Sequence, residues 1–149
     1  MLLVVAGLVA IIAIAGLTLD MAHAYLSKTR LQNALDAAAL SAARVLNDGS
    51  DVATAEAAGR LTFAEYLEGE LGTANPALEF EFSQTLVPFS SGAIEPDARY
   101  VRTRVASFPM GFWFARVLPG VGDSQAVAGT AVSGPSPPLG TGEEGEVCD

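Results

Sequence analysis

The chain begins with an uncharged apolar run, residues 1–19, which reads MLLVVAGLVAIIAIAGLTL. Only Gly7, Gly16 and Thr18 dilute its hydrophobicity. As a helix, about 19 residues extend roughly 28 Å, close to the thickness of the hydrocarbon core of a bilayer. The run therefore predicts a transmembrane segment. A secretory signal peptide cleaved within MAHA is the alternative, but no basic residue precedes the run and helix-favouring sequence follows it.

Residues 20–46 take on an amphipathic pattern without any helix breaker in between. Apolar positions recur at spacings of four and three, the period of one helix face; they are Leu31, Leu35, Ala38, Ala42 and Val45. Alanine, the best helix former, fills much of the remainder. NDGS at 47–50 should end the helix, with Gly49 left-handed. We expect one helix of about 46 residues, near 69 Å long, about half of it embedded in something else.

A second helix is expected after this stop, because Ser50 or Asp51 can cap its N-terminus. Its apolar positions follow helical spacing; they are Val52, Ala55, Gly59, Phe63, Tyr66 and Leu67. We expect Gly72 to end it, and the dipeptide NP at 75–76 is typical of a turn.

The apolar period then changes to two, which predicts β-strands. Alternation marks LEFEFSQTL at 78–86 and RYVRTRVAS at 99–107, and QAVAGTAVSG at 125–134 alternates more weakly. The expected fold class is therefore α+β, with a long N-terminal helix, a second helix and a small antiparallel sheet of about three strands.

Two details of the sheet follow from the pattern. If the first two strands pair antiparallel, Arg102 and Arg104 face Glu79 and Glu81 across the sheet. In the aromatic-rich segment FPMGFWFARVLPG, residues 108–120, a short helix that covers the sheet is expected at Phe112, Trp113, Phe114 and Val117. Trp113 and its neighbours have two interpretations, packing as such a lid or anchoring at a membrane interface.

These patterns divide the chain into three parts. Residues 1–19 form the transmembrane segment, and residues 20–134 form the head. Residues 135–149, PSPPLGTGEEGEVCD, are too rich in Pro, Gly and Glu to bury a core, which predicts a linker or tail. The lone Cys148 has no partner in this sequence, and whether a partner lies downstream in a longer chain stays open.

Charge and composition exclude several functions. The net charge is −9, from 17 acidic and 8 basic residues, so nucleic-acid binding is not expected and any membrane attachment must be hydrophobic. His23 is the only histidine, which leaves no second site for a Ser-His-Asp triad. One His and one Cys make no zinc cluster, and no phosphate-binding loop is present. We expect no catalysis, cofactor, metal or small-molecule substrate.

The polar residues next to the apolar run raise two questions. Asp20 is costly near hydrocarbon, so it either marks the membrane boundary or pairs with a basic group on a neighbouring chain. Lys28 and Arg30 follow the run, and the positive-inside rule applied to them alone places residue 20 onward in the cytoplasm. A Met directly abutting the run suggests an incomplete N-terminus, and a few upstream basic residues would reverse that topology.

The stretch GLTLDMAHAYLSKTRLQNALDAAALSAARVL resembles the N-terminal signature of the TadE/TadG-like proteins of tight-adherence (Flp-type) pilus assembly. The signature is an apolar helix, G-L-x-x-D, a tyrosine, a basic position and L-Q-x-A-x-D-A-A-A-L. The matching positions are Gly16, Leu17, Asp20, Tyr25, Lys28, Arg30, Leu31, Gln32, Ala34, Asp36, Ala37, Ala38, Ala39 and Leu40.

The resemblance implies a non-enzymatic, pilin-like, single-pass protein of the bacterial inner membrane with an extracytoplasmic head. It implies a role in pilus assembly or as a minor pilin or pseudopilin, with the bilayer, other pilin-like subunits and the pilus machinery as partners. Leu31, Leu35, Ala38 and Ala42 would seat the head on the helix, and Asp20 and Tyr25 are candidate assembly residues. The alternatives are a membrane-tethered adhesion module and a non-catalytic subunit of an envelope enzyme.

Overall fold

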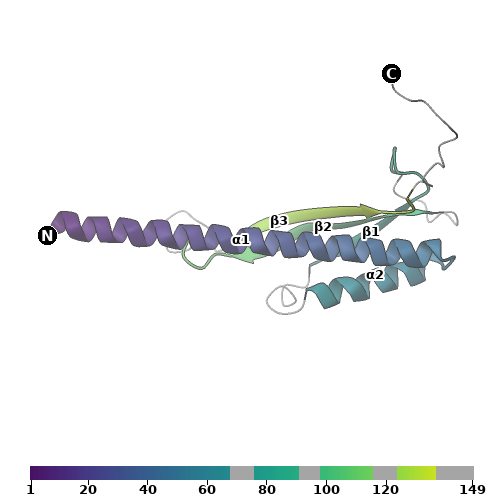
Figure 1. Cartoon of the computed structure of the whole chain (residues 1–149), viewed down its shortest axis with the longest axis horizontal. Helices are drawn as coiled ribbons and strands as arrows, with labels where there is room; N and C mark the ends of the chain where they lie inside the picture. The colour runs from purple at the N-terminus through teal and green to yellow at the C-terminus, as the bar shows by residue number, and fades with distance from the viewer. Residues whose placement is uncertain (68–75, 91–97, 116–123, 137–149) are drawn as a thin grey trace, which may run out of the picture.

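A rod-like helix projects from a small α+β head in the computed structural model, which describes residues 1–67, 76–90, 98–115 and 124–136 (Figure 1). The elements are α1 (Leu2–Asn47), α2 (Val52–Tyr66), β1 (Leu78–Ser83), β2 (Tyr100–Gly111) and β3 (Ser124–Ser133). The strands form an antiparallel sheet in the order β1-β2-β3. The predicted α+β class, with two helices and three strands, is confirmed.

The apolar run and the amphipathic stretch form one continuous helix of 46 residues, as predicted. Gly49 follows it with a φ of 93°, in the left-handed region that glycine adopts readily. Asp51 then caps α2, because its carboxylate accepts the backbone N–H of Thr54 at 2.8 Å. The described part of α2 ends at Tyr66, and the predicted stop at Gly72 lies outside the described residues.

The register of the sheet agrees with the sequence-based prediction. Glu79 lies opposite Arg104, and Glu81 lies opposite Arg102. The Arg102 guanidinium forms an ion pair with Glu81 and lies over the ring of Phe89, 4.1 Å from its centroid. The charged side chains therefore occupy the face of the sheet that points away from the helices.

Two strand boundaries differ from the prediction. β1 ends at Ser83 rather than residue 86, because the Ser83 hydroxyl accepts the N–H groups of Thr85 and Ser90, each at 3.2 Å, and forms a local turn. β2 continues beyond residue 107 to Gly111. The third strand begins and ends within one residue of the prediction.

The expected short helix at Phe112, Trp113, Phe114 and Val117 is wrong for its described part, because β2 continues to Gly111 and residues 112–114 after it are not helical. A register shift between Val105 and Phe108 gives β2 one extra residue relative to β3. Such a bulge moves the inward face to the next residue, so Phe108 and Met110 continue the buried row of β2. Residues 116–120 lie outside the described part of the chain.

The core lies between the helices and one face of the sheet. α1 packs against β2 and β3, and α2 packs against α1 and contacts β1. The C-terminal half of α1 is therefore the central element of the head, while its N-terminal half extends beyond the head (Figure 1).

Candidate membrane junction and assembly surface

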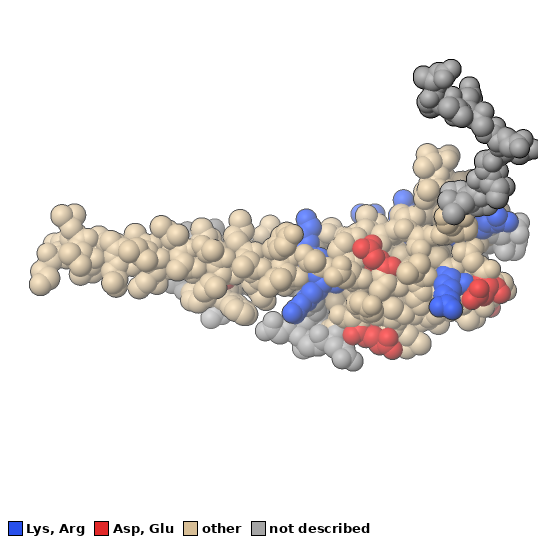
Figure 2. Space-filling model, in the orientation of Figure 1, with Lys and Arg blue, Asp and Glu red and all other residues tan. Residues whose placement is uncertain are grey.

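The projecting half of α1 is apolar on all sides. Residues 1–15 are exposed along their whole length. Among the described residues, one helix, α1, is long and apolar enough to cross a membrane, with a mean hydropathy of 2.8 over its most apolar window. Figure 2 shows this projecting part without exposed Lys or Arg, whereas charged side chains are spread over the head. A helix that is apolar on all sides and exposed over residues 1–15 fits a lipid environment.

The second half of α1 is buried along one face. Leu31 and Leu35 are the large side chains of this face, and Ala38 and Ala42 continue it toward the C-terminal end. Leu31, Leu35 and Ala38 belong to one core cluster with Val105 and Phe108 of β2. Ala42 belongs to a second cluster with Phe82 and Val101. All four predicted residues thus lie in the contact between α1 and the rest of the head.

Small residues let the elements of the head approach α1 closely. A Cβ at Gly59 would lie 2.6 Å from the Phe80 ring and 3.0 Å from the carbonyl oxygen of Ala38. A Cβ at Gly129 of β3 would lie 2.6 Å from Leu35 Cδ1. The Thr103 hydroxyl donates to the Leu35 carbonyl at 3.1 Å, which satisfies the one polar side chain in this part of the sheet.

Asp20 lies at the junction between the two halves of α1 and is only 4% exposed. Its carboxylate accepts the backbone N–H groups of three consecutive residues: Trp113 at 2.9 Å, Phe114 at 3.0 and 3.2 Å, and Ala115 at 2.5 Å. An ionised carboxylate offers about four lone-pair sites, and here a single loop of the same chain fills them. The predicted role of Asp20 as a contact to a neighbouring subunit stays a prediction, and this geometry shows the carboxylate engaged within its own chain.

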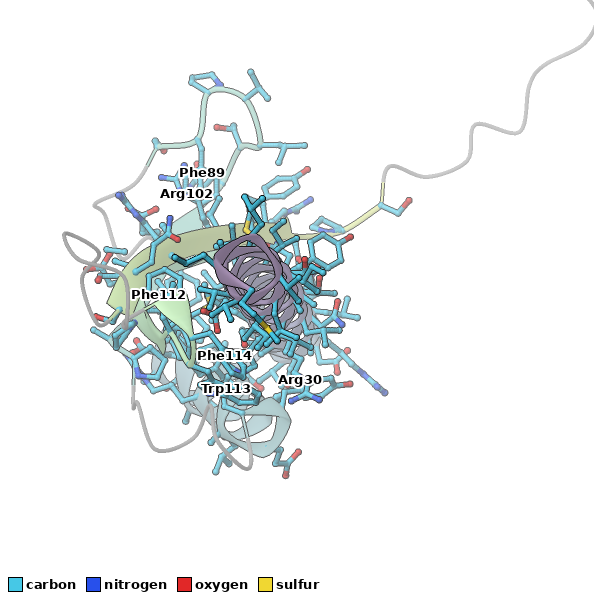
Figure 3. The ribbon with its side chains drawn as sticks, turned by 90° about the vertical axis from the view of Figure 1, so that its left-hand side faces the viewer. Arg30, Phe89, Arg102, Phe112, Trp113 and Phe114 are labelled. Atoms are coloured by element: carbon cyan, nitrogen blue, oxygen red, sulfur yellow. The ribbon has the colours of Figure 1, made fainter. Side chains whose placement is uncertain are left out.

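The loop that Asp20 holds, residues 112–115, is called the aromatic loop below. The Trp113 ring stacks on His23 with 4.5 Å between ring centroids. Phe114 lies against Gly16, where an added Cβ would be 2.9 Å from Phe114 Cβ. Figure 3, which looks along α1 from its N-terminal end, shows Trp113 and Phe114 together on one side of the helix, away from Phe89.

An apolar cavity of about 380 Å³ opens beside this loop. Its walls are α1 residues between Val9 and Leu17 on one side and Phe114 and Ala115 on the other. The aromatic loop therefore lies alongside the apolar run, and the contact between head and α1 extends past Asp20 toward the N-terminus.

Tyr25 points away from the core and is one of the most exposed large side chains of α1 outside the apolar run. Met21 precedes it by four residues, and Leu26 follows it directly; both are also exposed. Residues four apart share one side of a helix. Met21 and Tyr25 thus extend the uncovered apolar surface of residues 1–19 into the level of the head.

Asp51, a charged group of the head, has a structural role as the cap of α2. The pKa of the Asp51 carboxyl lies below its ordinary value, because the side chain and backbone N–H of Thr54 hydrogen-bond to the ionised form. Within the described ranges, no group of three or more His, Cys, Asp or Glu side chains is placed to hold a metal ion.

Sequence reasoning identified Asp20 and the aromatic segment but did not connect them. They are 93 to 95 residues apart in the chain, and neither periodicity nor spacing reports such a contact. A signal was present in the composition, because a carboxylate directly after an apolar run needs donors and the aromatic segment was expected to pack on something apolar.

The comparisons with known proteins support the N-terminal part of this description. Residues 1–45 match the family described as "Putative Flp pilus-assembly TadE/G-like". Comparison with curated proteins and with solved structures gave no match. The match and the apolar helix together indicate membrane anchoring and association with pilus machinery, and they favour a non-enzymatic protein. Residues 1–45, which make up α1 almost to its end, are thus similar to the TadE/G-like family of Flp pilus assembly, and this match supports a role in pilus assembly.

Proposed function

We propose that this protein is a single-pass inner-membrane component of a tight-adherence pilus system that acts through helix-mediated assembly, as a minor pilin or an assembly factor. One observation carries the proposal. A single helix, α1, is bare and apolar over its first half and is the buried spine of the head over its second half. This is the pilin-like arrangement expected of a subunit that moves between a bilayer and a helical assembly.

The proposed topology follows the three parts of the chain. Residues 1–19 cross the membrane, residues 20–134 form an extracytoplasmic head, and residues 135–149 serve as a linker or tail. The described residues support the first two parts, because the exposed apolar surface gives way to the head at Asp20. Most of the proposed tail, residues 137–149, lies outside the described residues.

The proposed assembly surface is the exposed side of α1, from the apolar run to Tyr25. In a filament or an assembly complex, the apolar run must leave lipid or share it with other helices, and neighbouring apolar helices of pilin-like subunits would cover it. Met21 and Tyr25 would then be the first contacts outside the hydrocarbon region. Leu31, Leu35, Ala38 and Ala42 would hold the head at a fixed position on this helix.

Shearing surface filaments from cells tests the proposal. The sheared filaments and the membrane fraction are probed for this protein in a deletion strain complemented with the wild type, with the major pilin as marker. Presence in filaments makes it a minor pilin. Presence only in the membrane, with filaments lost on deletion, makes it an assembly factor. Absence from the filaments, together with unchanged filaments on deletion, would refute both and leave the membrane-tethered adhesion module.

A matched pair of variants locates the assembly surface. Tyr25→Glu places a charge on the proposed contact, and Leu61→Glu places the same charge on an equally exposed position of α2. We expect Tyr25→Glu to reduce filament number several-fold at normal protein level and Leu61→Glu to leave it unchanged. Equal filament numbers in the two variants would contradict the assignment of this surface.

A further inference from the structure

The geometry points to a membrane-contacting surface on the head. We propose that the aromatic loop, residues 112–115, inserts into the lipid interface beside α1 and holds the head against the bilayer. The inference rests on the proposed membrane crossing of residues 1–19 and is independent of the role in pilus assembly.

The aromatic loop lies at the same level along α1 as part of the apolar run. Phe114 contacts Gly16, and Phe114 and Ala115 share a cavity with α1 residues as far back as Val9. Val9 precedes Asp20 by about 11 residues, or roughly 16 Å along the helix axis. If residues 1–19 cross the bilayer, part of this loop lies below the level at which the apolar run ends.

The hydrogen bonds to Asp20 make the backbone of the loop compatible with an apolar environment. Backbone N–H groups without partners are strongly disfavoured in hydrocarbon. The N–H groups of Trp113, Phe114 and Ala115 all donate to the Asp20 carboxylate. Asp20 thereby satisfies the donors that would oppose insertion of the loop. The loop N–H groups in turn solvate the Asp20 carboxylate, which lowers the cost of its burial.

The exposed side chains of the loop are of the kind that favours a lipid interface. Trp113 is 52% exposed and Phe114 is 47% exposed, although both pack against α1 on one side. Phe114 lines a cavity together with residues of the apolar run, so its exposed part adjoins the surface that lipid would cover. Tryptophan favours the membrane interface, because its ring is apolar and its indole N–H seeks a polar partner. Lipid is therefore the occupant that this surface fits.

Trp113 is the only tryptophan of the chain, so its fluorescence reports the loop directly. The full chain is reconstituted into phosphatidylcholine vesicles that contain lipids brominated either near the headgroup end or near the tip of the acyl chains. We expect stronger quenching by the shallow bromine, weak quenching by aqueous iodide and a blue-shifted emission. Strong iodide quenching without quenching by brominated lipid would overturn the proposal.

A second copy of the chain is the competing occupant of this surface. Trp113 would then be shielded from both iodide and bromine, and its accessibility would rise as the protein is diluted in lipid. That result would overturn insertion while leaving the membrane crossing intact. Loss of the protein from the vesicle fraction would instead overturn the crossing itself, so the two failures are distinguishable.

Two glycine variants test whether α1 positions the loop. Gly16→Ala places a methyl group 2.9 Å from Phe114 Cβ, whereas nothing lies within 4 Å of a Cβ at Gly7. Both changes keep the apolar run uncharged. We expect Gly16→Ala to raise iodide quenching of Trp113 several-fold and to weaken quenching by the shallow bromine, while Gly7→Ala changes neither. Identical quenching in the two variants would overturn the docking of the loop on α1.

Discussion

The two halves of α1 differ in how they are covered, although no break separates them. Residues 1–15 expose large aliphatic side chains on every side. From Leu31 to Ala43, the buried face consists of two leucines and five alanines, and it packs against α2 and the sheet. The first half therefore depends on its surroundings for cover, whereas the second half is covered by the chain itself.

The difference shows how one helix serves two environments. Large side chains maximise apolar surface where lipid is the solvent, and small ones allow α2 and β3 to approach the backbone where protein is the solvent. Asp20 lies between the two zones and accepts hydrogen bonds from the aromatic loop, which follows β2 in the chain. The junction is therefore a tertiary contact in addition to a change of composition.

The largest effect is expected from a charge in the covered half. Leu35 is 0% exposed and Leu40 is 64% exposed on the same helix. Leu35→Asp buries an unpaired carboxylate and should lower the free energy of unfolding of the head by about 4 kcal/mol. Leu40→Asp should stay within about 0.5 kcal/mol of the wild type. Limited proteolysis of the full chain in detergent compares them, and wild-type protease resistance of Leu35→Asp would show that the assigned face is wrong.

A smaller effect is expected where small residues allow close packing. Gly59→Val would push a side chain into the Phe80 ring and the Ala38 carbonyl, which should cost about 1–3 kcal/mol. Ala57→Val introduces the same residue at an exposed position of α2 and should cost about half a kcal/mol through helix propensity alone. Thermal unfolding followed by circular dichroism measures both. Equal melting temperatures would mean that α2 does not need this close approach.

The ion pair on the outer face of the sheet should contribute less. Arg102 and Glu81 remain 29% and 31% exposed, so solvent screens them, and a double-mutant cycle should give a coupling of about 0.5–1 kcal/mol. Arg104 and Glu79 occupy the neighbouring opposed positions and are more exposed. The same cycle there is the control, with a smaller coupling expected. A larger coupling for the control pair would reverse the ranking of the two contacts.

The smallest effect is expected at the cap of α2 and depends on pH. Hydrogen bonds to Thr54 lower the pKa of Asp51 in the folded protein from its ordinary value of 3.8. The carboxylate therefore contributes to stability above pH 3.8, and this contribution is lost as the pH falls through the pKa of the folded state. Asp51→Asn keeps the acceptor but does not titrate. The melting temperature of the wild type should therefore fall further in acid than that of Asp51→Asn. Parallel pH profiles would argue against this carboxylate as the titrating cap.

The helices and strand pairing were predictable because their signals are local. The spacing of Leu31, Leu35 and Ala38 fixed the buried face of α1, and the charge alternation of β1 and β2 fixed their register. Gly49 was predictable as the helix stop because few other residues adopt a positive φ readily.

The errors arose where local patterns conflict with tertiary structure. The bulge between Val105 and Phe108 interrupts the two-residue period, which hid the continuation of β2. Pro109 and the aromatic residues after it then resembled a break followed by a helix. The contact of Asp20 with the aromatic loop was not predicted. The sequence signals that a carboxylate directly after an apolar run needs donors, but the donors are backbone N–H groups of a distant segment, which every sequence possesses.

The most direct test of the account compares the two halves of α1 by thiol labelling. Val5 and Leu40 are about equally exposed in the chain itself, at 61% and 64%. Each is changed to cysteine in a Cys148→Ser background, and spheroplasts are treated with a membrane-impermeant maleimide. We predict that Leu40→Cys reacts in intact spheroplasts, whereas Val5→Cys reacts only after detergent dissolves the membrane. Equal labelling of both, or labelling of Leu40→Cys only after lysis, would contradict a membrane-embedded first half below an extracytoplasmic head.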